Sequence, residues 1–535
     1  MARADTGNGS LYNNTKLKRI KKKSKTEEYF DEHLTEILPD SYQNGDVVSS
    51  ERLLAFADVI MAICAAFLVV PIRNLVSLKN GQTLLEFIYK IQTEVIMFFL
   101  GFAVILAIWE NINIRAMVIK RIDDIVLTLV ISELLITTVL PFLLALQGHY
   151  PFEIASTILT CCILGLIQII DIVLICYATS SPRILHIEMQ KWSNCELRKV
   201  RTIFLIKPIV SFLLVLAGGL FCFIHFAISW SFIAVLVFMP TIRNLHLFIR
   251  QRIDKRSKME KYQFYFFFSK GSILKDRVEV MSDTIIAIVA CILILDITEK
   301  NFPSKERIQK YGLLSALDNM KPEFLSFLAT FIIILTLWYV NHIVLNMFRT
   351  VTAIMLHFQK IFLAFVSLCP ILGSLILGFS KKGNEDTKAS IRVAALVVFC
   401  SSSSNLFIFL YGFLTKKKYL LPSALNELKS DSYNYFYAIF NVATVPVWSI
   451  FCALGTIGTP KVSLCMLYIS FVGLPLSFII SKLILVNFFG KKVQPKYIEF
   501  ETYDFEQNKK NTNDSLGKQH VQSNVLDSID NTKIG

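Results

Sequence analysis

Long apolar runs, separated by short polar segments, occupy most of this chain. Each run is about 20 residues or longer, which is the length that a helix needs to cross a hydrocarbon layer of roughly 30 Å. The pattern therefore predicts twelve transmembrane helices. Their approximate ranges are 51–72, 86–114, 123–146, 153–178, 202–223, 227–246, 277–297, 322–347, 356–379, 389–414, 433–455 and 462–488.

The polar segments divide these helices into two sets of six. Residues 51–246 form the first set, residues 277–489 form the second, and a basic linker at 247–276 joins them. Residues 1–50 and 490–535 are too polar to bury a core, so we expect two disordered tails. The sequence predicts an all-α polytopic membrane protein.

Composition and charge support this fold class. Apolar residues make up 54% of the chain, charged residues make up 18%, and the mean hydropathy is +0.54. Soluble domains have roughly 45–50% apolar residues and roughly 25% charged residues. The net charge of +14 is typical of nucleic-acid binding, but no basic groove with interleaved aromatic residues accompanies it. Instead, Lys and Arg are concentrated in the loops that lie inside if both termini are cytosolic. The loop at 298–321, with five basic residues, is the exception.

The sequence contains no pattern that indicates an enzyme. Ten of the eleven cysteines fall inside apolar runs and no CxxC occurs, so we expect neither disulfides nor a metal site. HExxH, a Gly-rich phosphate loop and a nucleophile elbow are also absent from the sequence. We therefore expect no cofactor and no catalytic residues.

The first helices of the two sets align without a gap. Residues 52–72 and 277–297 are identical at eight of 21 positions. The most specific matches are an Arg and an Asp six residues apart, since any two membrane helices share Ile, Leu and Ala: Arg52 with Asp58, and Arg277 with Asp283. Because each set has an even number of helices, the two repeats are parallel.

These first helices resemble the R-x-x-x-F-S-D signature of the transmembrane protein 175 family. The resemblance covers about 51–490, and each copy departs from the signature at one position. The matching residues are Arg52, Phe56, Ala57 and Asp58 in the first repeat, and Arg277, Met281, Ser282 and Asp283 in the second.

The resemblance implies a multi-pass channel of the endosome and lysosome membrane that passes potassium, and protons as a second ion. It also implies a homodimer in which four first helices surround one central pore. By position, Ile63 and Ile288 would form a hydrophobic constriction that gates by dewetting. Family members can carry a threonine three residues further on; here Ala66 and Cys291 stand there, which argues against strong potassium selectivity.

Helix geometry separates the Asp from the isoleucine. Ile63 lies about 140° around the helix from Asp58, so the two side chains serve different purposes. We expect the Asp to anchor the helix by bonding to neighbours and to the Arg one to two turns earlier. The opposite face would line the pore, although such a face is more commonly in lipid or core: Phe56, Ile60, Ile63, Phe67 and Val70, and Met281, Ile285, Ile288, Ile292 and Leu295.

Other polar residues inside the spans have two interpretations each. Trp109 and Trp338 either donate to the Asp residues or belong to an interfacial aromatic belt, and Asn341 and His342 are further candidates for this network. Two intramembrane acids, Glu133 and Asp171, either relay protons or are paired within the bundle.

A secondary transporter is the alternative function. Transporters tend to have helices interrupted at matching positions of both halves. Here Pro71 has Asp296 as its counterpart, and both first helices read as uninterrupted, which favours a channel.

Overall fold

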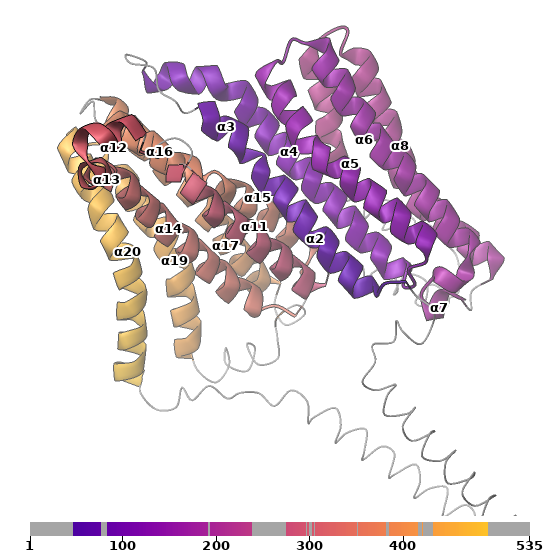
Figure 1. Cartoon of the computed structure of the whole chain (residues 1–535). Coiled ribbons are helices and arrows are strands. Elements are labelled where there is room, and N and C mark those ends of the chain that lie inside the picture. The colour runs from indigo at the N-terminus through magenta and orange to yellow at the C-terminus, as the bar shows by residue number, and fades with distance from the viewer. Residues whose placement is uncertain are drawn as a thin grey trace, which may run out of the picture. The chain divides into compact units, whose positions relative to one another are not determined.

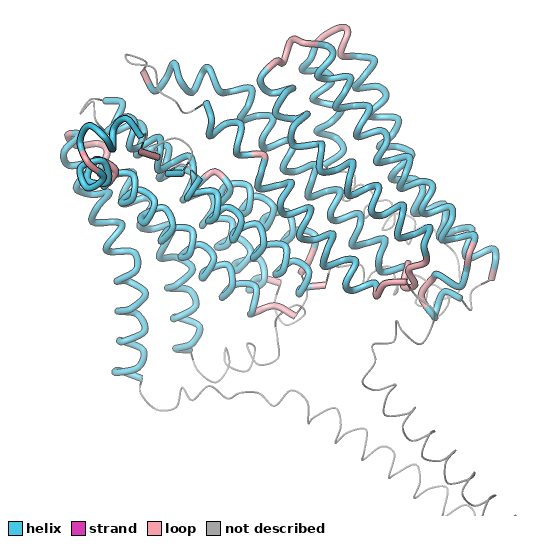
Figure 2. Tube along the Cα trace, in the orientation of Figure 1, coloured by secondary structure: helices cyan, strands magenta, loops and turns pink. Residues whose placement is uncertain are grey.

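The computed structural model describes most of the membrane region. The described residues are 47–75, 83–190, 193–237, 274–295, 297–298, 302–303, 305–349, 351–380, 385–415, 420 and 432–489. They form helices joined by loops (Figure 2), and two isolated β-bridges occur among the loops. The predicted C-terminal tail, and nearly all of the predicted N-terminal tail and linker, lie outside the described residues.

Eleven of the described helices are long and apolar enough to span a membrane, which confirms eleven of the twelve predicted spans. The twelfth, predicted at 227–246, is described only to residue 237, where a shorter apolar helix covers Phe226–Val237. The first repeat otherwise consists of α2 (Ser50–Phe67), α3 (Val69–Leu75), α4 (Leu84–Val118), α5 (Asp124–His149), α6 (Ile154–Ser180), η1 (Pro182–Ile184), α7 (Ile187–Gln190) and α8 (Asn194–Phe221).

The second repeat has the same order of long helices. Its elements are α11 (Lys275–Leu295), α12 (Lys305–Tyr311), α13 (Leu313–Asp318), α14 (Lys321–Asn346), α15 (Ala353–Ser367), α16 (Cys369–Ser380), α17 (Glu385–Leu414), α19 (Ser432–Gly455) and α20 (Pro460–Phe489). The short helices α12 and α13 lie between its first and second spans.

Corresponding details recur in the loops of both repeats. Asp123 caps α5 by accepting from the Val126 N–H at 2.9 Å, and Thr352 caps α15 by accepting from the Met355 N–H at 3.3 Å. An isolated β-bridge precedes each cap: Ile119 pairs with Leu185, and Phe348 pairs with Leu420. The duplication therefore extends beyond the first helices.

Prolines interrupt two of the spans. Proline has no N–H for the carbonyl four residues earlier. Pro71 accordingly follows the break at Leu68 between α2 and α3, and Pro370 follows the break at Leu368 between α15 and α16. We had expected both first helices to be uninterrupted; this is wrong for repeat one, whereas α11 is continuous to Leu295.

The two repeats meet along their first helices. Helix α2 packs directly against α11, and α15 of the second repeat also contacts α4 of the first (Figure 1). One large cluster of buried apolar side chains runs through both repeats. The contact between α2 and α11 places the two signature segments beside each other.

Candidate functional site

Asp58 is fully buried on the pore-helix candidate α2. The indole Nε1–H of Trp109 donates to its carboxylate at 2.7 Å, and Nη1 of Arg277 donates to it at 2.9 Å. A carboxylate inside a membrane protein is retained only when such partners replace water. The expected bond from Trp109 to the Asp is confirmed, and the aromatic-belt alternative is not needed for it.

The arginine that reaches Asp58 comes from the other repeat. We had expected Arg52, which is six residues earlier on the same helix. Residues six apart point about 120° away from each other, so Arg52 cannot easily reach that face. Arg277 instead crosses from α11, and its Nη2 also donates to the Glu51 carbonyl at 3.3 Å. The Arg–Asp pair therefore joins the repeats.

In the second repeat, the signature Asp has its tryptophan partner but no arginine partner in the part of the same chain that the structure describes. Trp338 donates to Asp283 at 2.8 Å, as Trp109 does to Asp58. Asp283 is nevertheless exposed, and the side chain of Arg52 is also exposed. Among the described residues, Trp338 is the one side chain that binds Asp283, and Arg52 forms no ion pair.

The two first helices bury opposite faces. On α2, Asp58, Ala62 and Ala66 are fully buried, whereas their equivalents on α11 (Asp283, Ala287 and Cys291) are exposed. The reverse holds for a second face: Met281, Ile285 and Ile292 are buried, while Phe56 and Phe67 are exposed and Ile60 is half-buried. Packing within a repeat is common to both helices, so this difference arises from the contact of α2 with α11.

These burial patterns change the expected pore lining. Ile63 is 39% exposed and Ile288 is half-buried, so both predicted constriction residues have free surface. Ala66, Ile285 and Ile292 pack against neighbouring helices instead of facing an open passage. Signature residues Ala57 and Ser282 also face inwards, and the Ser282 hydroxyl accepts from Gln359 Nε2 at 2.8 Å.

A groove of about 420 Å³ lies beside the exposed face of α2. Ile60, Ile63 and Phe67 form one wall, and Thr138 and Phe142 on α5 form the other. The groove is apolar and open, and it is large enough to receive side chains from another helix.

Neither Asn341 nor His342 joins Asp283. His342 stacks on Trp338 with ring centroids 5.7 Å apart, and its Nε2 lies 2.8 Å from Nδ2 of Asn346. Asn341 is buried elsewhere in the bundle. The polar network is thus different in the two repeats beyond the shared Trp–Asp bond.

A second ion pair between the repeats was not anticipated from the sequence. Lys360 on α15 donates to Glu110 on α4 at 2.7 Å, and both side chains are buried. A charged residue inside an apolar span indicates that a buried partner exists. A single sequence does not indicate which distant helix supplies that partner.

We predict strong coupling between Glu110 and Lys360. Glu110→Leu or Lys360→Leu removes one partner of this buried ion pair and should destabilise the protein by about 3–5 kcal/mol, whereas the double substitution should cost much less than the sum. Thermal unfolding of all four proteins in the same detergent measures the coupling. Strictly additive losses would show that the pair does not hold the repeats together.

Repeat one contains a buried ionic cluster at the junction of four helices. Arg115 on α4 binds both Glu133 on α5 and Asp171 on α6. Asn111 donates to Asp171, and Lys207 on α8 donates to Asn111 at 2.9 Å. Glu133 and Asp171 are therefore paired within the bundle, which was the structural alternative for both acids.

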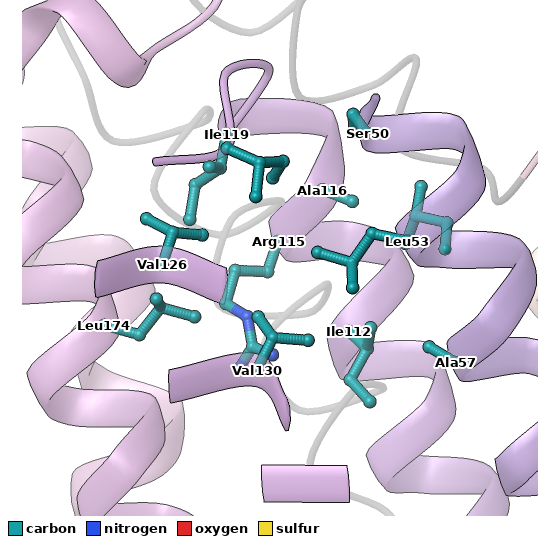
Figure 3. A pocket seen from close by; sticks show the side chains of 12 residues that line it. Ser50, Leu53, Ala57, Ile112, Arg115, Ala116, Ile119, Val126, Val130 and Leu174 are labelled. Carbon is teal, nitrogen blue, oxygen red and sulfur yellow. The ribbon is translucent and has the colours of Figure 1, made fainter. Parts of the chain in front are cut away.

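A small cavity of about 30 Å³ adjoins this cluster between α2 and α4–α6 (Figure 3). Arg115 is its one charged lining residue, and the signature residue Ala57 lies across from it. The volume suffices for a water molecule beside the Arg115 side chain.

We predict that Arg115→Ala unfolds repeat one under conditions where the parent chain is stable. The substitution leaves two buried carboxylates without their cation, at a cost of about 3–5 kcal/mol. The measurement is the melting temperature of the purified protein. Arg121→Ala, in the loop after α4, is the matched control and should change little; equal effects of the two would contradict a special role for the cluster.

Together, fold and site define a class of protein: a membrane protein with two helical repeats, whose first helices each carry an Arg, an Asp that accepts from a tryptophan, and a following isoleucine. The family model described as "Endosomal/lysosomal potassium channel TMEM175" matches residues 52–141 and 277–370, which are the corresponding parts of both repeats. The chain is therefore similar to this family in both of its repeats.

Curated relatives show the same similarity over most of the chain. The endosomal/lysosomal proton channel TMEM175 of Danio rerio is 27% identical, over 70% of this chain and 72% of the relative. Its counterpart in Gallus gallus is 25% identical, over 80% and 86%, and that of Homo sapiens is 23% identical, over 70% and 75%. These proteins are named as channels, consistent with the expectation that the chain is not an enzyme.

Proposed function

We propose that this chain is a cation channel of the endosome and lysosome membrane, in which two copies of the chain enclose one passage. The observation that carries the proposal is the complementary burial of α2 and α11. The face that is buried on α2 is exposed on α11, and the face that is buried on α11 is exposed on α2. A second copy related by a two-fold axis would present the missing face at both places, which closes a ring of four first helices.

The absence of an arginine partner for Asp283 among the described residues of one chain supports the same arrangement. Arg277 reaches Asp58 across the contact between repeats within one chain, at 2.9 Å. Repeating that contact between copies brings Arg52 of one copy to Asp283 of the other. Both side chains are exposed in the single chain, and burial of an opposite-charge pair favours a defined register between partners.

Ile63 and Ile288 would then form the narrowest part of the passage. They are the fifth residues after Asp58 and Asp283, and both keep free surface in the single chain. A ring of isoleucine side chains excludes water until it widens, so it can gate the flow of ions.

Potassium and protons are the proposed permeant ions. The family description names potassium, and the curated relatives are named as proton channels. Ala66 is buried and Cys291 carries no hydroxyl, so neither position offers the oxygen ligands that favour one alkali cation over another. We therefore propose weak discrimination between potassium and sodium. The loop charges support both termini facing the cytosol.

Recordings from enlarged endolysosomes that express this chain test the proposal. With opposed potassium, sodium and proton gradients, we expect a passive current whose reversal potential shifts when either the potassium or the proton gradient is changed. Vesicles from cells without the chain provide the baseline. Solute uptake that requires a coupled ion, without such a current, would establish the transporter alternative instead.

A further inference from the structure

A large cavity of about 380 Å³ lies within the second repeat, between α14, α16, α17, α19 and α20. Protein interiors rarely contain voids much larger than a water molecule, whereas cavities of this size hold ligands. Its space results from small side chains on the surrounding helices: Ala329, Gly373, Ala394, Ala395, Ser449 and Cys452.

The wall of this cavity offers almost nothing to a polar ligand. Among the described residues that line it, no side chain is charged, and there is no His, Asn or Gln. The hydroxyls of Thr330, Ser449 and Ser470 donate to backbone carbonyls of their own helices at 2.8 Å. Ser326, Trp448 and Tyr468 are the other polar side chains of the wall, and Trp448 donates to Ser477 at 2.9 Å. Buried water needs two to four polar partners, so this mostly apolar wall holds water poorly.

The cavity opens toward the bilayer between α14 and α20. Leu325 and Leu328 on α14, and Tyr468 and Val472 on α20, line it and are more than half exposed. Cys369 and Leu372 lie at its floor and are buried. On α14 the lining runs from Pro322 to Ile333, which at 1.5 Å per residue is about 17 Å, or roughly one leaflet of the hydrocarbon layer.

We propose that this cavity binds one acyl chain of a phospholipid from the leaflet at the N-terminal end of α14. An empty cavity would lose dispersion contacts on every side, and water cannot replace them. A hydrocarbon chain can, and the opening faces the phase that supplies it. The bound chain supports α14 and α16, both of which pack against α11.

Photolabelling of the full chain in nanodiscs tests the site. The probe is a phosphatidylcholine with a diazirine on one acyl chain, and mass spectrometry locates the adducts. In the parent chain we expect adducts at floor residues such as Cys369 and Cys452, besides those on outward surfaces. Ala395→Phe fills the cavity and should remove most floor adducts; Leu396→Phe, on the adjacent lipid-facing residue, is the matched control and should retain them.

Cys452→Met is a second filling variant, for use if Ala395→Phe does not fold. Melting temperatures give an independent readout, because a ligand that binds the folded state stabilises it. Removal of lipid should lower the melting temperature of the parent chain more than that of a filled variant. Absence of floor adducts in the parent chain, or floor adducts unchanged by filling, would overturn the proposal. Neither readout depends on ion conduction.

Discussion

Replacing Ile63 and Ile288 together by Asn is expected to raise the resting current by about tenfold, which corresponds to a barrier lowered by about 1.4 kcal/mol. An amide at the constriction provides hydrogen bonds to water and so removes the cost of wetting an apolar neck. The measurement is the current density in enlarged endolysosomes, normalised to the amount of protein in the same membranes.

The conservative pair Ile63→Val and Ile288→Val is the control. Valine keeps the constriction apolar, so the current should remain close to that of the parent chain. If the Asn variant conducts no more than the Val variant at equal expression, these isoleucines do not form the gate. A current that rises in only one of the single Asn variants would place the constriction on one repeat.

Arg52→Glu is expected to separate the two copies. It places a carboxylate opposite Asp283 at both proposed contacts between copies, and loss of a buried charge pair costs about 2–5 kcal/mol, or a 30-fold to several-thousand-fold weaker association per contact. Single-molecule photobleaching of fluorescently tagged chains at low density counts the copies directly. The double variant Arg52→Glu with Asp283→Arg restores opposite charges and should restore the pairs.

Arg277→Glu is the informative comparison for that experiment. Its contact with Asp58 lies within one chain at 2.9 Å, so it should lower folding stability without a specific effect on copy number in the protein that folds. Arg52→Glu chains that stay paired with unchanged affinity would contradict the proposed contact between copies.

Hydropathy was sufficient to predict eleven spans, because the length of a membrane-spanning helix is fixed by the thickness of the membrane. The Trp109–Asp58 bond was also predictable, since a buried carboxylate requires donors. Which arginine pairs with Asp58 was not predictable, because a periodic pattern within one helix gives no information about a neighbouring helix. The same limit concealed the partnership of Lys360 with Glu110, which lie 250 residues apart.

The interruption of the third span of repeat two could not be predicted from its proline alone. Pro141 stays within the continuous helix α5, whereas the equivalent Pro370 follows a break after α15. Proline alone therefore does not determine whether a membrane helix divides, because neighbouring helices can satisfy the freed carbonyl groups.

The Arg277–Asp58 contact and the proposed Arg52–Asp283 contact have unequal consequences for inheritance. The Arg277–Asp58 contact lies inside each polypeptide, so an allele that breaks it lowers the folding stability of its own product, and a normal chain keeps this contact even in a mixed pair. Under the proposed assembly, a chain altered at Arg52 also pairs with normal chains. Each such mixed pair loses one of its two contacts between copies. Carriers of one Arg52 allele should show a dominant defect, whereas carriers of one Arg277 allele should be close to normal.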